Sequence, residues 1–320
     1  MTKNAQIAAA IVSLQEIFVD SPSYLSLKAE FDRLVEIKSN EFTSGRFREA
    51  RGIALVGESG SGKSTAMRRL LRTLPADFLP DLKPEACPVL SFSVPSPATL
   101  KFVGQHGLQA IGYPLTRDKT SQIIWDMFRA HLQSRQTAFV HLDEAQDLSI
   151  HQTPKEVQSV LNTLKSLMQN PRWPVGVILS GMPSLKTMIN QDVQLARRLC
   201  PIEMPRLAAF SHTDEVQDII GYYAKMAGVE IEPDVLSEAH VRRHIHAASG
   251  NFGLVIEFVI EALETVMRCD SSILAEEHFS SVFRRRSGCL DELNPFVAAD
   301  FERIDAKLVL QSSIEALEPA

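Results

Sequence analysis

The stretch that decides the fold is Gly57-Glu58-Ser59-Gly60-Ser61-Gly62-Lys63-Ser64-Thr65, which follows the apolar run Gly52-Ile53-Ala54-Leu55-Val56. It satisfies the pattern G-x-x-x-x-G-K-[ST], in which glycines let backbone N–H groups turn inward around phosphate oxygens. Lys63 would add a charge for the β- and γ-phosphates, and Ser64 a hydroxyl ligand for Mg²⁺. A plain Gly/Ser turn is the alternative, but here strand, loop and helix are expected in the order that a phosphate site requires. The sequence therefore predicts that residues 57–65 bind ATP with Mg²⁺.

Bulk composition limits the kind of protein. The chain has 320 residues, of which 45% are hydrophobic and 22% charged, as in an ordinary soluble globular protein. Its net charge of −6 excludes nucleic-acid binding through overall basicity, so DNA contact would need a local patch or a ring of subunits. The N-terminus lacks the pattern of an export signal, no long apolar run occurs, and the four cysteines are scattered. We expect a cytoplasmic protein with reduced thiols and no membrane partner.

A second motif lies 80 residues downstream, in Thr137-Ala138-Phe139-Val140-His141-Leu142-Asp143-Glu144. An apolar strand that ends in Asp-Glu is the Walker B pattern. At the carboxyl end of a parallel strand, Asp143 can hold Mg²⁺, usually through water. Glu144 is placed to deprotonate the attacking water as a general base. The strand predicted between Lys63 and Asp143 favours the additional-strand branch of phosphate-loop ATPases over nucleotide kinases.

Two further features suggest groups that respond to the γ-phosphate. The apolar run 175–179 ends at Ser180, where a phosphate-sensing side chain is expected, although the turn Gly181-Met182-Pro183 could equally explain a serine there. Arg197 and Arg198 precede the last predicted strand, and such a pair suits an arginine finger that reaches a neighbouring subunit's phosphate. A solvated basic pair is the alternative.

The order of elements predicts an α/β fold with several parts. Residues 46–208 alternate strand, loop and helix, which is typical of a parallel sheet flanked by helices. Residues 1–45 predict an N-terminal helical appendage, with a break near Ser21. Residues 209–288 predict a smaller, all-helical lid domain, and residues 289–320 a peripheral, acidic C-terminal tail.

The predicted lid contains two charged features. His240 and His244 have the i, i+4 spacing of a metal-binding pair, but nearby ligands are lacking and Arg242 and Arg243 would repel a cation, so we expect no metal. The run 284–286 consists of three arginines. It is either a solvated helix C-terminus, favourable to the helix dipole, or a contact to DNA phosphates.

The sequence as a whole resembles an AAA+ ATPase. The resemblance rests on the two Walker motifs, the strand ending at Ser180, the paired arginines and the helical lid. Within that class, four segments are similar to the TniB/TnsC transposition regulators: Ser96-Pro97-Ala98-Thr99-Leu100-Lys101, Gly112-Tyr113-Pro114, His141-Leu142-Asp143-Glu144-Ala145-Gln146 and Gly181-Met182-Pro183-Ser184-Leu185. The resemblance covers about residues 20–285. The secretion ATPase ExeA and the phage transposition protein MuB share much of this pattern.

The resemblance implies a slow, regulatory ATPase that oligomerises as a ring or helical filament on duplex DNA, without sequence preference. Such proteins link a TniQ-type target-selection protein to transposase subunits. By position, the Walker roles would belong to Lys63, Ser64, Asp143 and Glu144, the first sensor to Ser180, the finger to Arg197 or Arg198, and the DNA contacts to Lys101, Arg117 and Lys119. An arginine is often expected where Leu254 stands, so the resemblance does not extend to sensing of the γ-phosphate by the lid.

Two other functions agree with the same motifs. One is an ExeA-like secretion ATPase, and the other a P-loop enzyme that does not act on DNA, such as a small-molecule phosphotransferase. A phosphotransferase predicts no ATP-dependent oligomer, which distinguishes it from the transposition regulator.

Overall fold

The computed structural model describes residues 2–75, 78–96, 98–150 and 152–315; Pro97 of the resembling segment 96–101 lies outside them. The chain divides into two compact units. The sheet unit comprises Asp20–Glu58 and Lys63–Met204, and the helical unit comprises Met1–Val19, Ser59–Gly62 and Pro205–Ala320. Among the described helices, none combines the length and the apolar character that a membrane span would require.

The sheet unit is built on five parallel strands: β1 (Gly52–Gly57), β2 (Val89–Ser93), β3 (Phe139–Asp143), β4 (Gly176–Gly181) and β5 (Leu199–Met204). Their order is β2-β3-β4-β1-β5, so β3 lies between β2 and β4. Both β1 and β4 are buried along their whole length, which explains why their sequences are apolar apart from Ser180. The predicted parallel sheet is confirmed.

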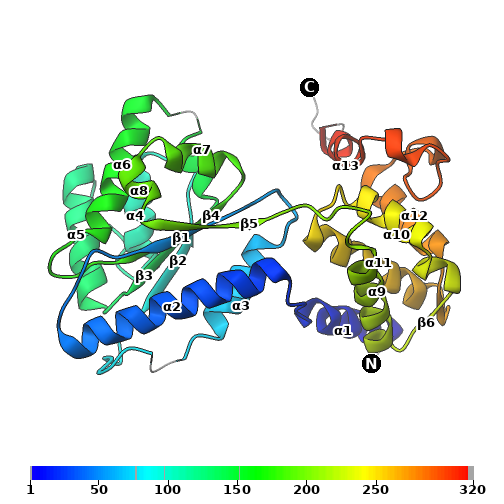
Figure 1. Cartoon of the computed structure of the whole chain (residues 1–320), viewed down its shortest axis with the longest axis horizontal. Helices are drawn as coiled ribbons and strands as arrows, with labels where there is room; N and C mark the ends of the chain where they lie inside the picture. The colour runs from blue at the N-terminus through cyan, green and yellow to red at the C-terminus, as the bar shows by residue number, and fades with distance from the viewer. Residues whose placement is uncertain (1, 76–77, 97, 151, 316–320) are drawn as a thin grey trace. The chain divides into compact units, whose positions relative to one another are not determined.

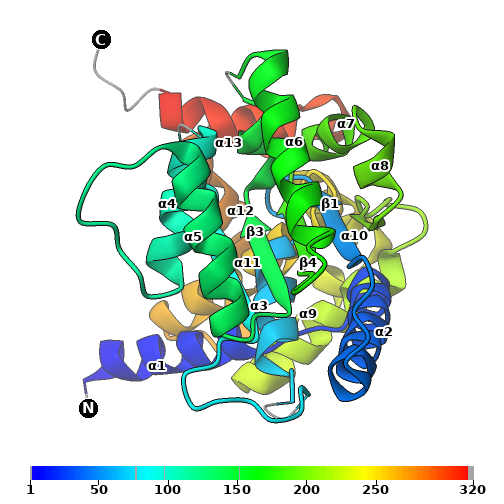
Figure 2. The ribbon, with the colours of Figure 1, turned by 90° about the vertical axis from the view of Figure 1, so that its left-hand side faces the viewer.

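Helices cover both faces of this sheet: α2 (Pro22–Ser44), α3 (Lys63–Arg72), α4 (Leu100–Ala110), α5 (Ser121–Ser134), α6 (Pro154–Met168), α7 (Ser184–Asn190) and α8 (Val193–Ala196). Val140 and Leu142 of β3 share a core with α4–α8, and α4 lies beside α5 (Figure 2). The opposite face is covered by α2 and α3 (Figure 1), and there Phe31 contacts Phe139 with ring centroids 5.3 Å apart. Because side chains alternate along a strand, His141 and Asp143 lie on the same face as Phe139.

The helical unit consists of α1 (Lys3–Glu16), α9 (Thr213–Ala227), α10 (Glu238–Ala247), α11 (Phe252–Arg268), α12 (Glu276–Ser287) and α13 (Ala306–Glu315), with 3₁₀ turns at Pro233–Leu236, Asp291–Leu293 and Phe301–Arg303. Its core is formed largely by α9, α11 and α12. The C-terminal segment also belongs to this core, since Phe296 and Ala306 are buried in it. The tail is therefore less peripheral than the sequence suggests.

Two local features of the helical unit differ from expectation. The region predicted to be all helical contains two short strands, β6 (Glu230–Ile231) and β7 (Ile273–Leu274), which pair in parallel. A two-residue strand is too short to leave a period in the sequence. The second difference is a 3₁₀ turn at Pro233–Leu236 in place of α-helix. The helix α10 follows it, and the Ser237 hydroxyl caps α10 by accepting a hydrogen bond from the His240 N–H at 3.1 Å.

The predicted N-terminal appendage is also divided. Leu14 of α1 packs in the core of the helical unit, whereas Phe31 of α2 packs on the sheet. Ser21 begins α2 by accepting a hydrogen bond from the Tyr24 N–H at 3.2 Å, with Pro22 in the first turn. This cap separates the two helices and lets each bury its apolar side in a different unit.

Two histidines are buried inside the helical unit rather than presented as ligands. His240 is 1% exposed and His244 is fully buried, and both rings contact Phe279 and Phe296. His244 Nε2 lies 3.1 Å from the Val255 carbonyl oxygen and so carries the ring hydrogen. Burial lowers the pKa of His244 to about 3, and burial together with Arg243 lowers the pKa of His240 to about 4.

This burial predicts a pH-dependent stability. Below the ordinary histidine pKa of 6.5, the unfolded chain binds protons on His244 that the folded chain excludes. The free energy of unfolding should therefore fall as the pH is lowered from 6.5 to 5, by about 2 kcal/mol for one buried imidazole. Urea unfolding of His244→Gln should show a shallower slope, because the buried His240 and His141 still contribute to it, whereas the exposed-residue control His106→Gln should keep the full slope. An equal slope in both variants would contradict the prediction.

Candidate active site

The phosphate-loop sequence forms the connection between β1 and α3. Gly60 and Gly62 have φ angles of +79° and +93°, a region that side chains rarely adopt. The helix α3 then starts at Lys63, whose ammonium donates hydrogen bonds to the carbonyl oxygens of Gly57 and Glu58 at 2.9 and 2.8 Å. An ammonium has three N–H groups, so one remains for a phosphate oxygen.

Lys63 is nearly buried, and this affects its charge. Burial lowers the pKa of Lys63, while the carboxylates of Glu144, Asp143 and Glu58 favour its charged form. A cation with few waters around it interacts more strongly with an anion than an exposed lysine would. The position is therefore suited to holding phosphate oxygens.

Asp143 brings together side chains from three elements. Its Oδ2 accepts a hydrogen bond from the Ser64 hydroxyl of α3 at 3.1 Å. Its Oδ1 accepts one from the Ser180 hydroxyl of β4 at 2.6 Å and one from the Glu144 N–H at 3.1 Å. The structure thus places the predicted metal ligands Ser64 and Asp143 in contact. The predicted sensor Ser180 donates its hydrogen bond to the other oxygen of the Asp143 carboxylate.

A buried histidine lies behind Ser180. His141 is 3% exposed, and its Nε2 and Nδ1 lie 2.7 Å from the Ser180 hydroxyl and 2.8 Å from the Ser91 hydroxyl. Burial lowers the pKa of His141 to about 4, although Asp143 opposes this, so the ring is neutral at physiological pH. Because Ser180 donates its only hydrogen to Asp143, it must accept from Nε2–H, and Nδ1 must accept from Ser91. The hydrogen bonds therefore run in one direction, from Ser91 through His141 and Ser180 to Asp143.

Glu144, the predicted base, follows Asp143 in an unusual conformation. Its φ of +54° lies in the left-handed region, which is uncommon for a residue with a side chain and is often found at functional sites. The side chain is exposed, and its Oε2 accepts a hydrogen bond from Gln146 Nε2 at 2.7 Å. The carboxylate is accessible to solvent and held from one side.

The donor set fits Mg²⁺. A hydroxyl and a carboxylate are the oxygen ligands that Mg²⁺ prefers, and neighbouring ligands in an octahedral shell with bonds of about 2.1 Å lie about 3 Å apart. The Ser64 Oγ and Asp143 Oδ2 atoms are 3.1 Å apart, which matches this spacing. A cavity of about 340 Å³ adjoins them and is lined by Ser64, Met67, Arg68, Leu71, Arg72, Ser91, His141 and Asp143.

The paired arginines at the end of α8 differ in their contacts. Arg198 donates hydrogen bonds to the Gln194 carbonyl oxygen and to the Glu49 carboxylate, the latter at 2.7 Å. Arg197 is exposed. An arginine finger at either residue stays a prediction, and Arg197 is the more exposed of the two.

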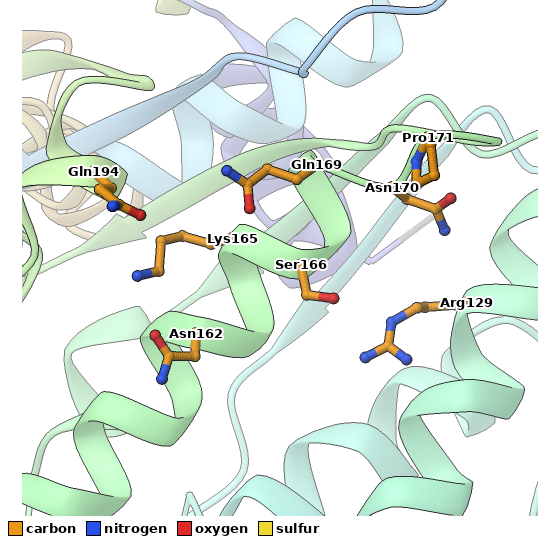
Figure 3. A pocket seen from close by; sticks show the side chains of 8 residues that line it. All are labelled: Arg129, Asn162, Lys165, Ser166, Gln169, Asn170, Pro171 and Gln194. Atoms are coloured by element: carbon orange, nitrogen blue, oxygen red, sulfur yellow. The ribbon is translucent and has the colours of Figure 1, made fainter.

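Figure 3 shows a polar cavity beside α8, of about 480 Å³, lined by Arg129, Asn162, Lys165, Ser166, Gln169, Asn170, Pro171 and Gln194. Both of its cations are paired, Lys165 with Asp192 at 2.5 Å and Arg129 with Asp126 at 2.6 Å. Asp192 also caps α8 by accepting from the Gln194 and Leu195 N–H groups. Burial alone would raise the pKa of Asp192, but the Lys165 and backbone hydrogen bonds lower it to about 2. The cavity therefore holds an ion pair that fixes the start of α8 rather than a binding site for anions.

The three residues predicted to contact DNA lie on or just after α4, outside the two Walker motifs. Lys101 is in the first turn of α4 and pairs with Asp118 at 2.5 Å, while Arg117 and Lys119 belong to the connection between α4 and α5. Their contact with DNA stays a prediction. The three arginines 284–286 are each paired with a carboxylate of the helical unit: Asp291, Glu261 and Glu257. This pairing favours the structural interpretation of that run.

Sequence reasoning did not assign roles to Ser91 and His141. One signal was available: His141 is the only polar residue before Asp143 in an otherwise apolar strand. Its partner Ser91 could not be found in this way, because the two residues are 50 positions apart and meet only through the register of β2 and β3.

Comparisons with known proteins agree with this arrangement. Residues 46–189 match the AAA domain family. General secretion pathway protein A of Aeromonas hydrophila is 26% identical over 229 residues, which cover 70% of this chain and 36% of that protein. The chain thus spans about a third of the length of this curated relative.

Solved structures share the fold at low sequence identity. Cdc6p from Pyrobaculum aerophilum matches with a TM-score of 0.60 and 15% identity, over 85% of this chain and 70% of that chain. The ORC1 protein of Aeropyrum pernix, solved in complex with DNA, matches with a TM-score of 0.58 and 18% identity, over 81% and 66%. The chain therefore has the α/β AAA+ fold, with a parallel five-stranded sheet and a C-terminal helical region, and the match to the AAA domain family lies in the part of the chain that holds the phosphate loop and the sheet.

Proposed function

We propose that this protein binds ATP with Mg²⁺ and hydrolyses it to ADP and phosphate as a slow, regulatory ATPase. The observation that carries the proposal is the 3.1 Å contact between Ser64 Oγ and Asp143 Oδ2, which joins the phosphate loop to the end of β3. Lys63 and Glu144 flank this pair in the sequence and supply a cation and an exposed carboxylate.

Each group has one task in this mechanism. The free N–H of Lys63 would bind the β- and γ-phosphates, and the N-terminus of α3 would favour their negative charge. Ser64 and Asp143 would hold Mg²⁺, which when bound withdraws charge from the phosphate oxygens. Glu144 would take the proton from the attacking water. Ser180 would act through Asp143, because its only hydrogen is donated there.

The test is ATP binding and phosphate release by the purified full chain. Fluorescent mant-ATP should bind in the presence of Mg²⁺, and inorganic phosphate should be released slowly from ATP. EDTA should abolish release. Phosphate release no faster than that of Lys63→Ala, under conditions where mant-ATP binds, would overturn the assignment of hydrolysis.

One candidate process is the regulation of DNA transposition. We propose that ATP between protomers drives assembly of a ring or filament on duplex DNA, linking a TniQ-type adaptor to a transposase. The support is the segment similarity described above, together with the exposed Arg197 after α8. Only this candidate function implies that the protein binds duplex DNA, the adaptor and the transposase.

A second candidate has direct support from the comparison with a curated protein. The 26% identity to General secretion pathway protein A favours an ExeA-type secretion ATPase, in which ATP hydrolysis serves a partner other than DNA. This match favours the second candidate over the first. The chain covers 36% of that relative, so the relative's whole activity is not transferred to this chain.

A DNA-binding assay distinguishes the two candidates. Fluorescence anisotropy of a labelled 60-base-pair duplex, with ATPγS, ADP or no nucleotide, should show ATPγS-dependent binding that weakens steeply with salt if the first candidate holds. The double variant Arg117→Ala/Lys119→Ala should weaken this binding equally for unrelated duplexes. Nucleotide-independent binding, or none, would exclude the transposition regulator and leave the secretion-type ATPase.

A further inference from the structure

One buried amide connects the predicted base with the end of β4. Gln146 belongs to the 3₁₀ turn Ala145–Leu148 and is 4% exposed. Its Nε2 donates hydrogen bonds to Glu144 Oε2 at 2.7 Å and to Asp147 Oδ1 at 3.1 Å. Its Oε1 accepts one from the Met182 N–H at 3.0 Å. Both ends of the amide are therefore engaged, one by carboxylates and the other by the chain after β4.

The chain after β4 is shaped to admit this amide. A Cβ atom on Gly181 would clash with Gln146 Oε1. Gly181 is not among the glycines with positive φ, so its backbone conformation alone does not require glycine. The absence of a side chain at Gly181 is thus explained by the space that Gln146 occupies.

The base itself needs such a partner. Glu144 is exposed, and an exposed glutamate side chain otherwise samples several rotamers. A general base must lie within hydrogen-bond reach of the proton that it removes, and small misplacements are costly. A buried, doubly anchored amide restricts the carboxylate without adding a charge that would neutralise it.

We propose that Gln146 is a positioning residue that ties the Glu144 carboxylate to the turn at Gly181-Met182, so that the end of β4 sets the direction of the base. The proposal rests on the proposed ATPase function. Ser180 on the same strand end holds Asp143, so both Walker B carboxylates are held from β4. A shift of the turn between β4 and α7 would therefore move the base and the metal ligand together.

Two variants test the role of the amide. Gln146→Met keeps the length of the side chain but removes its donor and acceptor. We expect kcat for ATP to fall about 10- to 100-fold, because a displacement of about 1 Å can cost about 10²-fold. The KM for ATP and the affinity for mant-ATP should stay within about twofold, since the phosphate-binding groups are unchanged. Gly181→Ala should lower kcat similarly by displacing the unaltered amide.

Combination and control variants separate positioning from general damage. If both changes act through one contact, Gln146→Met/Gly181→Ala should lose little more than either single variant. Gln133→Met makes the same chemical change at an exposed position of α5 and should hydrolyse ATP like the unaltered protein. If Gln146→Met fails to fold by thermal melting, Gly181→Ala carries the test alone.

The outcomes are distinct. Unchanged kcat in a folded Gln146→Met or Gly181→Ala, or a loss confined to KM, would overturn the positioning role while leaving the ATPase assignment intact. Absence of hydrolysis by the unaltered protein would overturn the proposed function first, and the positioning role with it. A selective fall in kcat in both single variants supports the inference.

Discussion

Replacing Glu144 by glutamine is expected to lower ATP hydrolysis about 10²- to 10⁴-fold, which is the usual contribution of a general base. The amide of glutamine has nearly the same shape as the carboxylate but does not accept a proton from water. Its oxygen can still accept the hydrogen bond from Gln146, so the surrounding structure should be unchanged. Single-turnover hydrolysis of γ-labelled ATP measures the loss, and mant-ATP titration should show unchanged binding.

The matched control for this variant is Asp147→Asn. Asp147 lies three residues after Glu144 and also accepts a hydrogen bond from Gln146. No role as a base is assigned to it. It should hydrolyse ATP at nearly the normal rate. Normal turnover in Glu144→Gln would remove Glu144 from the role of base. If the protein assembles on DNA, Glu144→Gln should also keep the assembly there, because ATP is bound and not consumed.

The second large effect is expected for Lys63→Ala, which should weaken ATP binding about 10- to 150-fold through loss of its one remaining N–H. Hydrogen bonds to a charged group contribute about 1.5–3 kcal/mol each, and a tenfold change in affinity corresponds to about 1.4 kcal/mol. The variant also removes the hydrogen bonds to the Gly57 and Glu58 carbonyl oxygens, so the loop loses an internal support. Isothermal titration with ATP and Mg²⁺ measures the affinity.

Lys63→Met separates the loss of the ammonium from the loss of packing, since it keeps most of the buried side chain and removes only the charge and all of its hydrogen-bond donors. It should bind ATP as weakly as Lys63→Ala if the ammonium contacts phosphate directly. The exposed Lys83→Ala is the control for loss of one positive charge. ATP affinity in Lys63→Met close to that of the unaltered protein would contradict the assigned role.

Much of the sheet unit could be predicted because its signals are local. The phosphate loop must join a strand to a helix, so β1 and the start of α3 followed from nine consecutive residues. The start of α6 also has a local signal, because Thr153 and Glu156 cap its N-terminus through reciprocal hydrogen bonds. The proximity of Ser64 and Asp143 was also expected, because both motifs follow the carboxyl ends of strands in one parallel sheet, where ligands bind. The strands themselves are not adjacent, since β4 lies between β1 and β3.

The remaining features depend on contacts that no local pattern encodes. The strand β3 is buried on both faces up to Leu142, so its sequence does not reveal which neighbour lies opposite His141. The burial of Phe296 in the helical unit depends on how the chain runs after α12, where residues 288–295 have no regular apolar period. The role of Gln146 could not be predicted from local sequence, because the Met182 N–H that anchors its amide lies 36 positions away.

The chain of hydrogen bonds that ends on Asp143 has an electrostatic consequence. Ser91, neutral His141 and Ser180 orient the carboxylate with hydroxyl and imidazole groups, none of which brings a positive charge. A lysine or arginine in the same place would form an ion pair and compete with any cation for the carboxylate. Here the full negative charge of Asp143 is preserved while its rotation is restricted. The site therefore gains rigidity without losing attraction for a divalent ion.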